Sequence, residues 1–268
     1  MTNICQPTQI HTKQLNYQQL GEGKNIVLIH GLFGSLENLN MVAKSLSQHY
    51  CVTSIDVRNH GNSFHQQDMD YQVLAQDVIN LLDDLSIEHC HILGHSMGGK
   101  IAMKIALSFP ERISKLIVAD IAPVKYPAHH LTIIEGLQAI DLTQVHKRKD
   151  ADIQLSKYVT DNGVRQFLLR NIALNEQGKF QFKCNLLFIA QGYEQIMQSL
   201  SGQADEQFNG DTLFIKGANS DYILPEHHSA IALLFPEAKA KIIQGAGHWL
   251  HAEKTVAFNK IVTRFLNS

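Results

Sequence analysis

Short, continuous runs of apolar residues recur along the chain and predict buried strands. Each run is too short for a helix and rich in β-branched residues, as is typical of strands buried on both faces of a parallel sheet. Residues 12–20 predict a further strand, antiparallel and at the edge. The clearest apolar runs span residues 26–29, 51–55, 91–93, 116–119, 212–215 and 241–243.

Helical patterns alternate with these strands. Apolar residues recur at helical spacing over residues 74–85, 101–109 and 256–266, and Pro110 predicts the end of the second of these helices. Alternating strands and helices imply right-handed crossovers between parallel strands. We therefore expect an α/β fold in which helices flank a mostly parallel, twisted sheet.

The alternation is interrupted between two of the predicted strands. Residues 123–207 carry mainly helical patterns, such as the apolar spacing over residues 164–172, and one short extended piece at residues 180–182. An insertion of this kind is typical of a cap over the end of a sheet. We assign residues 1–122 and 208–268 to the core and residues 123–207 to the cap.

The segment Gly94-His95-Ser96-Met97-Gly98 lies between a predicted strand and a predicted helix. This is the G-x-S-x-G nucleophile elbow in the strand–turn–helix context that it requires. The glycines allow close packing of a tight turn, and the helix N-terminus offers N–H groups to developing negative charge. The alternative is a glycine-rich turn with an incidental serine, but the flanking elements favour Ser96 as a nucleophile.

A second loop predicts the oxyanion hole. Residues 30–34 follow the strand at residues 26–29. In an elbow of this kind, the residue after the nucleophile supplies one N–H and the earlier loop supplies the other. We expect Met97 and Leu32 as donors, with Phe33 as the alternative to Leu32.

The histidine that would act as base is expected near the C-terminus. His248 follows the last predicted strand, precedes the final helix and is preceded by small residues that permit a close approach to the elbow. The chain order of serine, acid and histidine is the one this elbow usually accompanies. His251 lies within the predicted helix, and we therefore favour His248.

The acid has two candidates. The strand that begins at residue 212 runs out at Lys216, and four residues later the position at which an aspartate is expected holds Ser220, with Asp221 one residue further on. Asp120 directly follows the strand at 116–119 and reaches the same edge. Since triads are defined by geometry rather than by sequence position, we favour Asp120, keep Asp221 as the alternative and expect Ser220 to assist.

Composition narrows the function classes. A formal net charge of −2 argues against a nucleic-acid-binding protein.

Residues 1–20 lack the pattern of a secretory signal, and no apolar run approaches the roughly 20 residues of a membrane span. The four cysteines, Cys5, Cys51, Cys90 and Cys184, are too dispersed for a disulfide framework. We expect a cytoplasmic protein, a monomer or small homo-oligomer.

The chain contains 15 histidines but no HExxH motif and no Cys/His spacing typical of zinc. We therefore expect neither a metal nor another cofactor. The basic cluster at residues 147–149 predicts a solvated surface, with contacts to the phosphates of a CoA thioester as the alternative.

Several motifs together resemble the α/β-hydrolase fold family, and its small bacterial esterases in particular. They are HGLFGS at 30–35, DVRNHGNS at 56–63, GHSMGGK at 94–100, DIAP at 120–123, GANS at 217–220 and GAGHWLHAEK at 245–254. The resemblance covers nearly the full length. It implies a carboxylic-ester hydrolase with acyl-CoA thioesters as candidate ligands, and a triad acid at Asp120 assisted by Ser220.

The combined prediction is a serine esterase acting on a small acyl ester or thioester. The rival predictions are a carbon–carbon bond hydrolase with the same site and a non-catalytic binding protein, which would have no need of an intact elbow, base and acid. Aromatic residues of the cap are candidates for substrate contacts, although such residues more often form the core of a cap. The substrate-binding candidates are Phe33, Phe180, Phe182, Phe188, Tyr193 and Trp249.

Overall fold

The computed structural model describes residues 13–200 and 206–268, so that Cys5 and Thr12 lie outside the described residues. Its main feature is a sheet with the strand order β1-β3-β2-β4-β5-β8-β9. β1 is antiparallel to β3, and the other pairs are parallel. The strands are β1 (Tyr17–Leu20), β2 (Lys24–Ile29), β3 (Tyr50–Ile55), β4 (Cys90–His95), β5 (Ile113–Ala119), β8 (Thr212–Gly217) and β9 (Ala238–Ile243).

Each predicted apolar run lies within one of these strands, and the mostly parallel sheet flanked by helices is confirmed. The prediction that each run is buried on both faces of the sheet was wrong for residues 241–243. β9 is the last strand of the sheet and pairs with β8 on one side. Residues 239–242 are therefore exposed, and Ile243 alone in that strand is buried.

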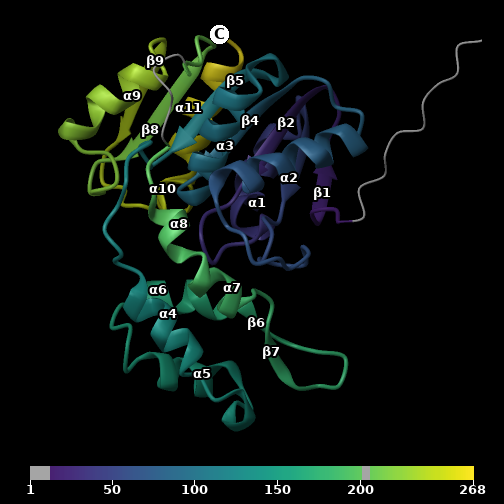
Figure 1. The fold of residues 1–268 in the computed structure, drawn as a ribbon, viewed down its shortest axis with the longest axis vertical. Helices are drawn as coiled ribbons and strands as arrows, with labels where there is room; N and C mark the ends of the chain where they lie inside the picture. The colour runs from purple at the N-terminus through teal and green to yellow at the C-terminus, as the bar shows by residue number, and fades with distance from the viewer. Residues whose placement is uncertain (1–12, 201–205) are drawn as a thin grey trace, which may run out of the picture.

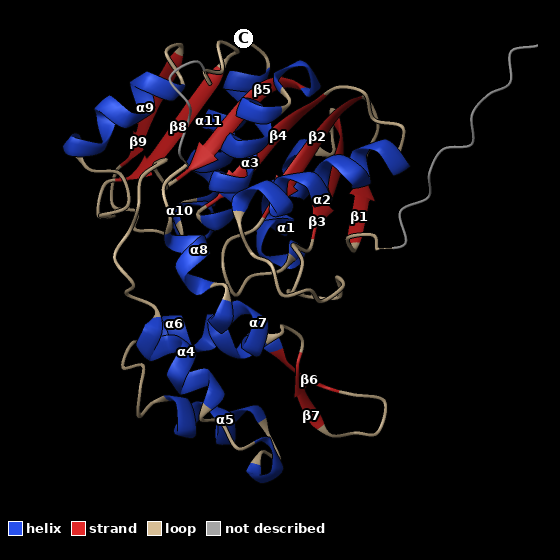
Figure 2. Cartoon of the chain, viewed as in Figure 1, coloured by secondary structure: helices blue, strands red, loops and turns tan. Residues whose placement is uncertain are grey.

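Helices cover both faces of the sheet (Figures 1 and 2). The alternation of side chains along a strand creates two cores: Val27 and Ile29 of β2 pack in one of them, and Ile26 and Leu28 in the other. The first core includes α2 (Tyr71–Asp84), α3 (Met97–Ser108) and α9 (His228–Leu234). The second includes α1 (Asn40–Leu46), α10 (Leu250–Glu253) and α11 (Thr255–Leu266).

The segment between β5 and β8 lies beyond the carboxyl ends of the parallel strands (Figure 1). It is mainly helical, and the predicted extended piece at 180–182 forms one strand of an antiparallel hairpin. No helix in the described part of the chain is both long enough and apolar enough to cross a membrane. The elements of the segment are α4 (Leu131–Gln138), α5 (Arg148–Leu155), α6 (Asn162–Leu168), β6 (Ile172–Leu174), β7 (Phe180–Phe182), α7 (Leu186–Gln191) and α8 (Tyr193–Met197).

A buried lysine of α3 contacts both ends of the inserted segment. Lys100 Nζ donates hydrogen bonds to the carbonyl oxygens of Val124 at 2.8 Å and Gln198 at 2.6 Å. Burial lowers the pKa of Lys100 to about 7. Because Lys100 lies four residues after Ser96, these bonds tie the inserted segment to the first turn of α3.

A buried ion pair fixes the loop after β3. Arg58 Nη2 lies 2.6 Å from Asp77 Oδ1 of α2, and Arg58 Nε donates to the other carboxylate oxygen. The two side chains are 5% and 10% exposed. Burial raises the pKa of Asp77, and the hydrogen bonds and charge of Arg58 oppose that shift.

We predict that Arg58→Met lowers the free energy of unfolding by about 3–5 kcal/mol, because it leaves a buried carboxylate without its partner. Lys104→Met is the matched control. Its ion pair with Glu206 is partly exposed and 4.0 Å long, and its loss should cost less than about 1 kcal/mol. Urea unfolding measures both, and equal losses would contradict the assigned importance of the Arg58–Asp77 pair.

Candidate active site

Ser96 lies at a sharp turn between β4 and α3. Its φ of 54° and ψ of −122° place it in a region that residues other than glycine rarely adopt. Close packing requires both glycines of the motif. A Cβ atom on Gly94 would lie 2.0 Å from the Gly98 carbonyl oxygen, and one on Gly98 would lie 2.3 Å from the Ile29 carbonyl oxygen. The turn therefore packs directly against the end of β2.

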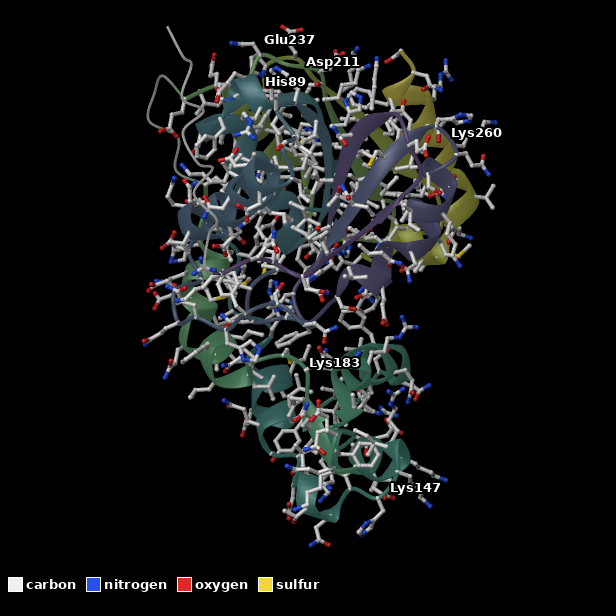
Figure 3. The ribbon with its side chains drawn as sticks, turned by 90° about the vertical axis from the view of Figure 1, so that its right-hand side faces the viewer. His89, Lys147, Lys183, Asp211, Glu237 and Lys260 are labelled. Carbon is white, nitrogen blue, oxygen red and sulfur yellow. The ribbon has the colours of Figure 1, made fainter. Side chains whose placement is uncertain are left out.

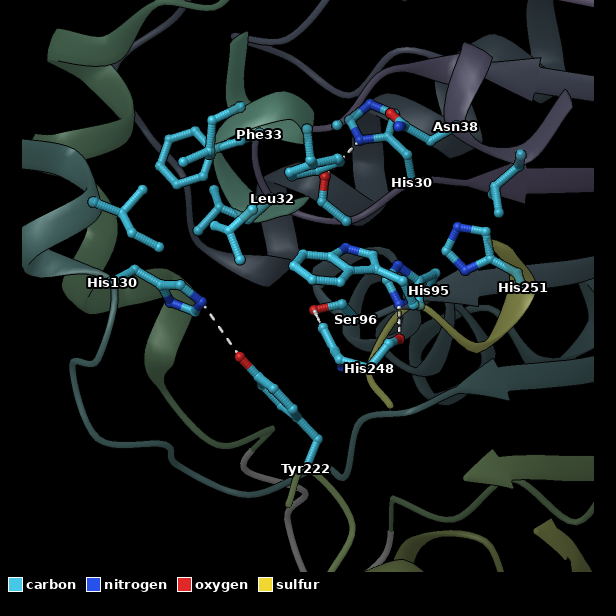
Figure 4. A pocket seen from close by; sticks show the side chains of 18 residues that line it. His30, Leu32, Phe33, Asn38, His95, Ser96, His130, Tyr222, His248 and His251 are labelled. Carbon is cyan, nitrogen blue, oxygen red and sulfur yellow. Dashed lines mark hydrogen bonds between the residues drawn. The ribbon is translucent and has the colours of Figure 1, made fainter. Parts of the chain in front are cut away.

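The turn brings Ser96 to a histidine that is far away in the sequence. His248 Nε2 lies 3.0 Å from Ser96 Oγ (Figure 4), and His248 Nδ1 lies 2.7 Å from Asp120 Oδ2. Because an Nδ1–H group donates to the carboxylate, Nε2 is free to accept the hydrogen bond of the serine hydroxyl. The three side chains thus form one continuous hydrogen-bond chain.

Asp120 is fully buried, and its carboxylate accepts two further hydrogen bonds. Gly217 N donates to Oδ1 at 3.0 Å, and Ser220 Oγ donates to Oδ2. This contact follows from the sheet, since Ala119 of β5 pairs with Ile215 of β8. Asp221 is exposed, and among the described contacts no hydrogen bond or ion pair joins it to His248. The structure therefore brings Asp120, and not Asp221, to the imidazole.

The other histidines around His248 are held neutral. Burial lowers the pKa of His95 well below its ordinary value and lowers those of His130 and His251 to about 4. His95 Nε2 lies 2.8 Å from the His248 carbonyl oxygen, to which it donates. An imidazolium formed at His248 at neutral pH would therefore meet no second positive charge among these three rings.

Two backbone amides near Ser96 are available to a ligand. Within the described part of the chain, the N–H groups of Leu32 and Met97 have no hydrogen-bond acceptor. Phe33 N–H is engaged, because it donates to His60 Nε2 at 3.1 Å. Burial lowers the pKa of His60 to about 3, which keeps that acceptor neutral. Of the two candidate amides in this loop, Leu32 N–H is therefore available to a ligand and Phe33 N–H is not.

A cavity of about 240 Å³ opens on Ser96 (Figure 4). The predicted contacts Phe33 and Trp249 line it, whereas Phe180, Phe182, Phe188 and Tyr193 are absent from its walls. Tyr193 is buried and accepts a hydrogen bond from His130 N through its hydroxyl. Helices α4 and α6 add Ile133, Val164, Phe167 and Leu168 to the apolar wall.

Sequence reasoning missed two polar residues of this cavity, Tyr222 and His130. The Tyr222 ring stacks on the His248 imidazole, with centroids 3.9 Å apart and planes 19° apart. Its hydroxyl lies 3.3 Å from His130 Nε2, as Figure 4 shows. The sequence holds no local signal for this contact, because the two residues come from different loops.

The basic cluster lies away from this cavity. Residues 147–149 are exposed and do not line it. Figure 3 shows Lys147 at the end of the inserted segment that is distant from the sheet. The structure also bears on the histidines as metal ligands. Among residues 13–200 and 206–268, no group of three or more His, Cys, Asp or Glu side chains is arranged so that it could hold a metal ion.

Comparison with known proteins places this site in a family. Residues 24–255 match the alpha/beta hydrolase fold. The chain belongs to the α/β-hydrolase fold family. A sn-1-specific diacylglycerol lipase, ABHD11 of Mus musculus, is 42% identical over 90% of this chain and 80% of its own length.

Two further α/β-hydrolase relatives cover nearly all of both chains. Esterase YbfF of Escherichia coli K12 is 35% identical over 90% of this chain and 92% of its own length. A solved structure of a marine microorganism esterase has a TM-score of 0.92 at 38% identity and covers 95% of this chain and 100% of that one. The expected family is confirmed, and these relatives support a hydrolase.

We predict that the buried, neutral His251 makes stability depend on pH. Its pKa is about 4 in the folded chain, below the ordinary 6.5. Between these values the unfolded state binds the extra proton, so the free energy of unfolding falls as pH falls from 6.5 to 4. Complete linkage of one proton contributes about 1.4 kcal/mol per pH unit.

Urea unfolding at pH 5 and pH 7 should show a smaller pH difference for His251→Phe than for the wild type. The exposed His49 provides the control, and His49→Gln should keep the wild-type difference. A His251→Phe chain with the full wild-type difference would show that His251 does not contribute.

Proposed function

We propose that the protein is a serine esterase that hydrolyses small acyl esters, and thioesters as a second substrate class, through an acyl-enzyme intermediate. Residues 123–207 serve as its cap. The observation that carries the proposal is the hydrogen-bond chain from Asp120 through His248 to Ser96. Nucleophile, base and orienting carboxylate are the groups that acyl transfer requires.

Acylation begins when Ser96 Oγ attacks the substrate carbonyl carbon while His248 Nε2 takes the hydroxyl proton. The carbonyl oxygen gains negative charge and accepts hydrogen bonds from Leu32 N–H and Met97 N–H. One such donor typically contributes about 3–4 kcal/mol of transition-state stabilisation. His248 then delivers its proton to the leaving alcohol or thiol as the acyl–leaving-group bond breaks.

Deacylation repeats these steps with water as the nucleophile. His248 takes a proton from the water, the hydroxide attacks the acyl carbon, and Ser96 Oγ leaves with the proton that returns from His248. Asp120 holds the imidazole tautomer throughout and stabilises the imidazolium. Ser220 and Gly217 keep the carboxylate in place through the hydrogen bonds that they donate.

The lining of the cavity at Ser96 favours a substrate whose leaving group is uncharged. Its walls are mostly apolar, and neither arginine nor lysine occurs among the described residues that line it. A buried anion without a cationic partner would be strongly disfavoured. The esterase and lipase names of the relatives support the same reaction class.

We predict that Ser96→Ala lowers kcat for aryl-ester hydrolysis by roughly 10⁶-fold while leaving the thermal unfolding temperature close to that of the wild type. A fluorophosphonate should label the wild type at Ser96 with one-to-one stoichiometry and leave the variant unlabelled. Full activity of the variant would refute the proposal. Labelling without hydrolysis of any ester would favour the carbon–carbon bond hydrolase, and absence of labelling would favour a binding protein.

The two candidate acids provide a matched pair of variants. Asp120→Asn should lower kcat by roughly 10⁴-fold, because the amide cannot orient and stabilise the imidazolium as a carboxylate does. Asp221→Asn should stay within about twofold, as is typical of a surface substitution away from the site. Steady-state kinetics on one aryl ester decides between them, and the reverse order of effects would make Asp221 the acid.

A further inference from the structure

Two cavities of different size meet at Ser96. The large cavity described above measures about 240 Å³, and a small one measures about 20 Å³. Leu32, Ser96, His130 and Tyr222 line both. Since both cavities reach the nucleophile, each can receive one of the two substituents on the carbonyl carbon of a substrate.

The cavities differ in the catalytic group that each one contains. His248 lines the large cavity and is absent from the walls of the small one, whereas Met97 lines the small cavity and is absent from the walls of the large one. The general acid must lie within hydrogen-bond reach of the leaving atom. The leaving group therefore belongs in the large cavity with His248, and the acyl chain points into the small one.

The size of the small cavity limits the acyl chain. A cavity needs about 10–15 Å³ to hold one water molecule. The small cavity, at about 20 Å³, is close to this lower limit and therefore accepts only a very short chain. That is the methyl group of an acetyl ester or the ethyl group of a propionyl ester.

Hydrogen bonds hold the wall of the small cavity in place. Ile196 and Met197 of α8 line it. Tyr71 of α2 donates to the Ile196 carbonyl oxygen at 2.6 Å, and Tyr126 N donates to that of Met197 at 2.9 Å. Lys100, which also lines the cavity, is tied to the next residue of the same segment. An outward movement of this backbone, which a longer acyl chain would require, would break these bonds.

We propose that the small cavity is the acyl pocket, so that the enzyme prefers acetyl and propionyl esters or thioesters of bulky, apolar alcohols or thiols. This inference rests on the proposed function and names its substrate class. In the acylation step the short acyl group moves from the leaving oxygen or sulfur to Ser96 Oγ, and the leaving group departs through the large cavity with the proton from His248. Water then releases acetate or propionate.

Two substrate series test the proposal on the whole protein. The first keeps a naphthyl leaving group and varies the acyl chain through acetyl, butyryl, octanoyl and palmitoyl. The second keeps the acetyl group and varies the alcohol through methyl, butyl, benzyl and naphthylmethyl, so that the leaving oxygens have similar basicity. We expect kcat/KM to fall by roughly tenfold or more from acetyl to octanoyl and to rise along the alcohol series. A kcat/KM that rises with acyl length would overturn the proposal.

Variants of the two walls should separate the effects. Met197→Ala enlarges the small cavity and should raise the octanoyl-to-acetyl ratio of kcat/KM by roughly tenfold or more, since one methylene in an apolar pocket changes kcat/KM by roughly 10- to 200-fold. Phe167→Ala alters the large cavity and is the matched control. It should flatten the alcohol series and leave the acyl ratio unchanged. If Met197→Ala flattened the alcohol series and Phe167→Ala changed the acyl ratio, the small cavity would bind the leaving group, and the proposal would be overturned.

The outcomes distinguish this inference from the proposed function. Ester hydrolysis that depends on Ser96 but prefers long acyl chains would leave the esterase standing and refute the acyl pocket. Hydrolysis that persists in Ser96→Ala would refute both. The wild-type series decides the inference by itself, so that the result does not depend on the folding of Met197→Ala.

Discussion

The backbone of Ser96 is held in a left-handed conformation, and the positions of the other functional groups depend on it. The turn is possible because Gly94 and Gly98 leave no Cβ atom between β4, α3 and the end of β2. This packing sets the serine hydroxyl at the edge of the sheet and orients Met97 N–H, the first amide of α3, beside it. The loop after β2 brings Leu32 N–H to the same cavity walls. A side chain at either glycine would separate the Ser96 hydroxyl from these two amides, which we propose as its oxyanion donors.

Much of this arrangement could be predicted because its signals are local. Buried strands need continuous apolar runs, and the elbow needs small residues around Ser96, so both are visible in the sequence. The choice of acid could not be settled locally. Asp120 and Ser220 meet because β5 and β8 are neighbours in the sheet, whereas the position of Asp221 depends on the path of a loop. The place of Phe167 in the cavity wall likewise depends on which face of α6 the inserted segment turns towards Ser96.

The electrostatics of the site suit a reaction in which His248 gains a proton and later loses it. Burial keeps His95, His130 and His251 neutral, while Asp120 contacts the ring nitrogen of His248 that faces away from Ser96. Tyr222 stacks on the imidazole and limits its rotation. The acyl chain of the substrate then lies in the small cavity, and the leaving group lies in the large cavity beside His248.

In the proposed mechanism, attack by Ser96 turns the substrate carbonyl oxygen into an oxyanion that accepts hydrogen bonds from Leu32 N–H and Met97 N–H. The most direct measurement is a crystal structure of the protein with Ser96 esterified by a small alkyl phosphonate, a stable mimic of the tetrahedral intermediate. We expect a phosphonyl oxygen 2.7–3.1 Å from both amide nitrogens, the range typical of oxyanion donors, with His248 still hydrogen-bonded to Asp120. A phosphonyl oxygen that contacts neither amide, or an adduct on another residue, would contradict it.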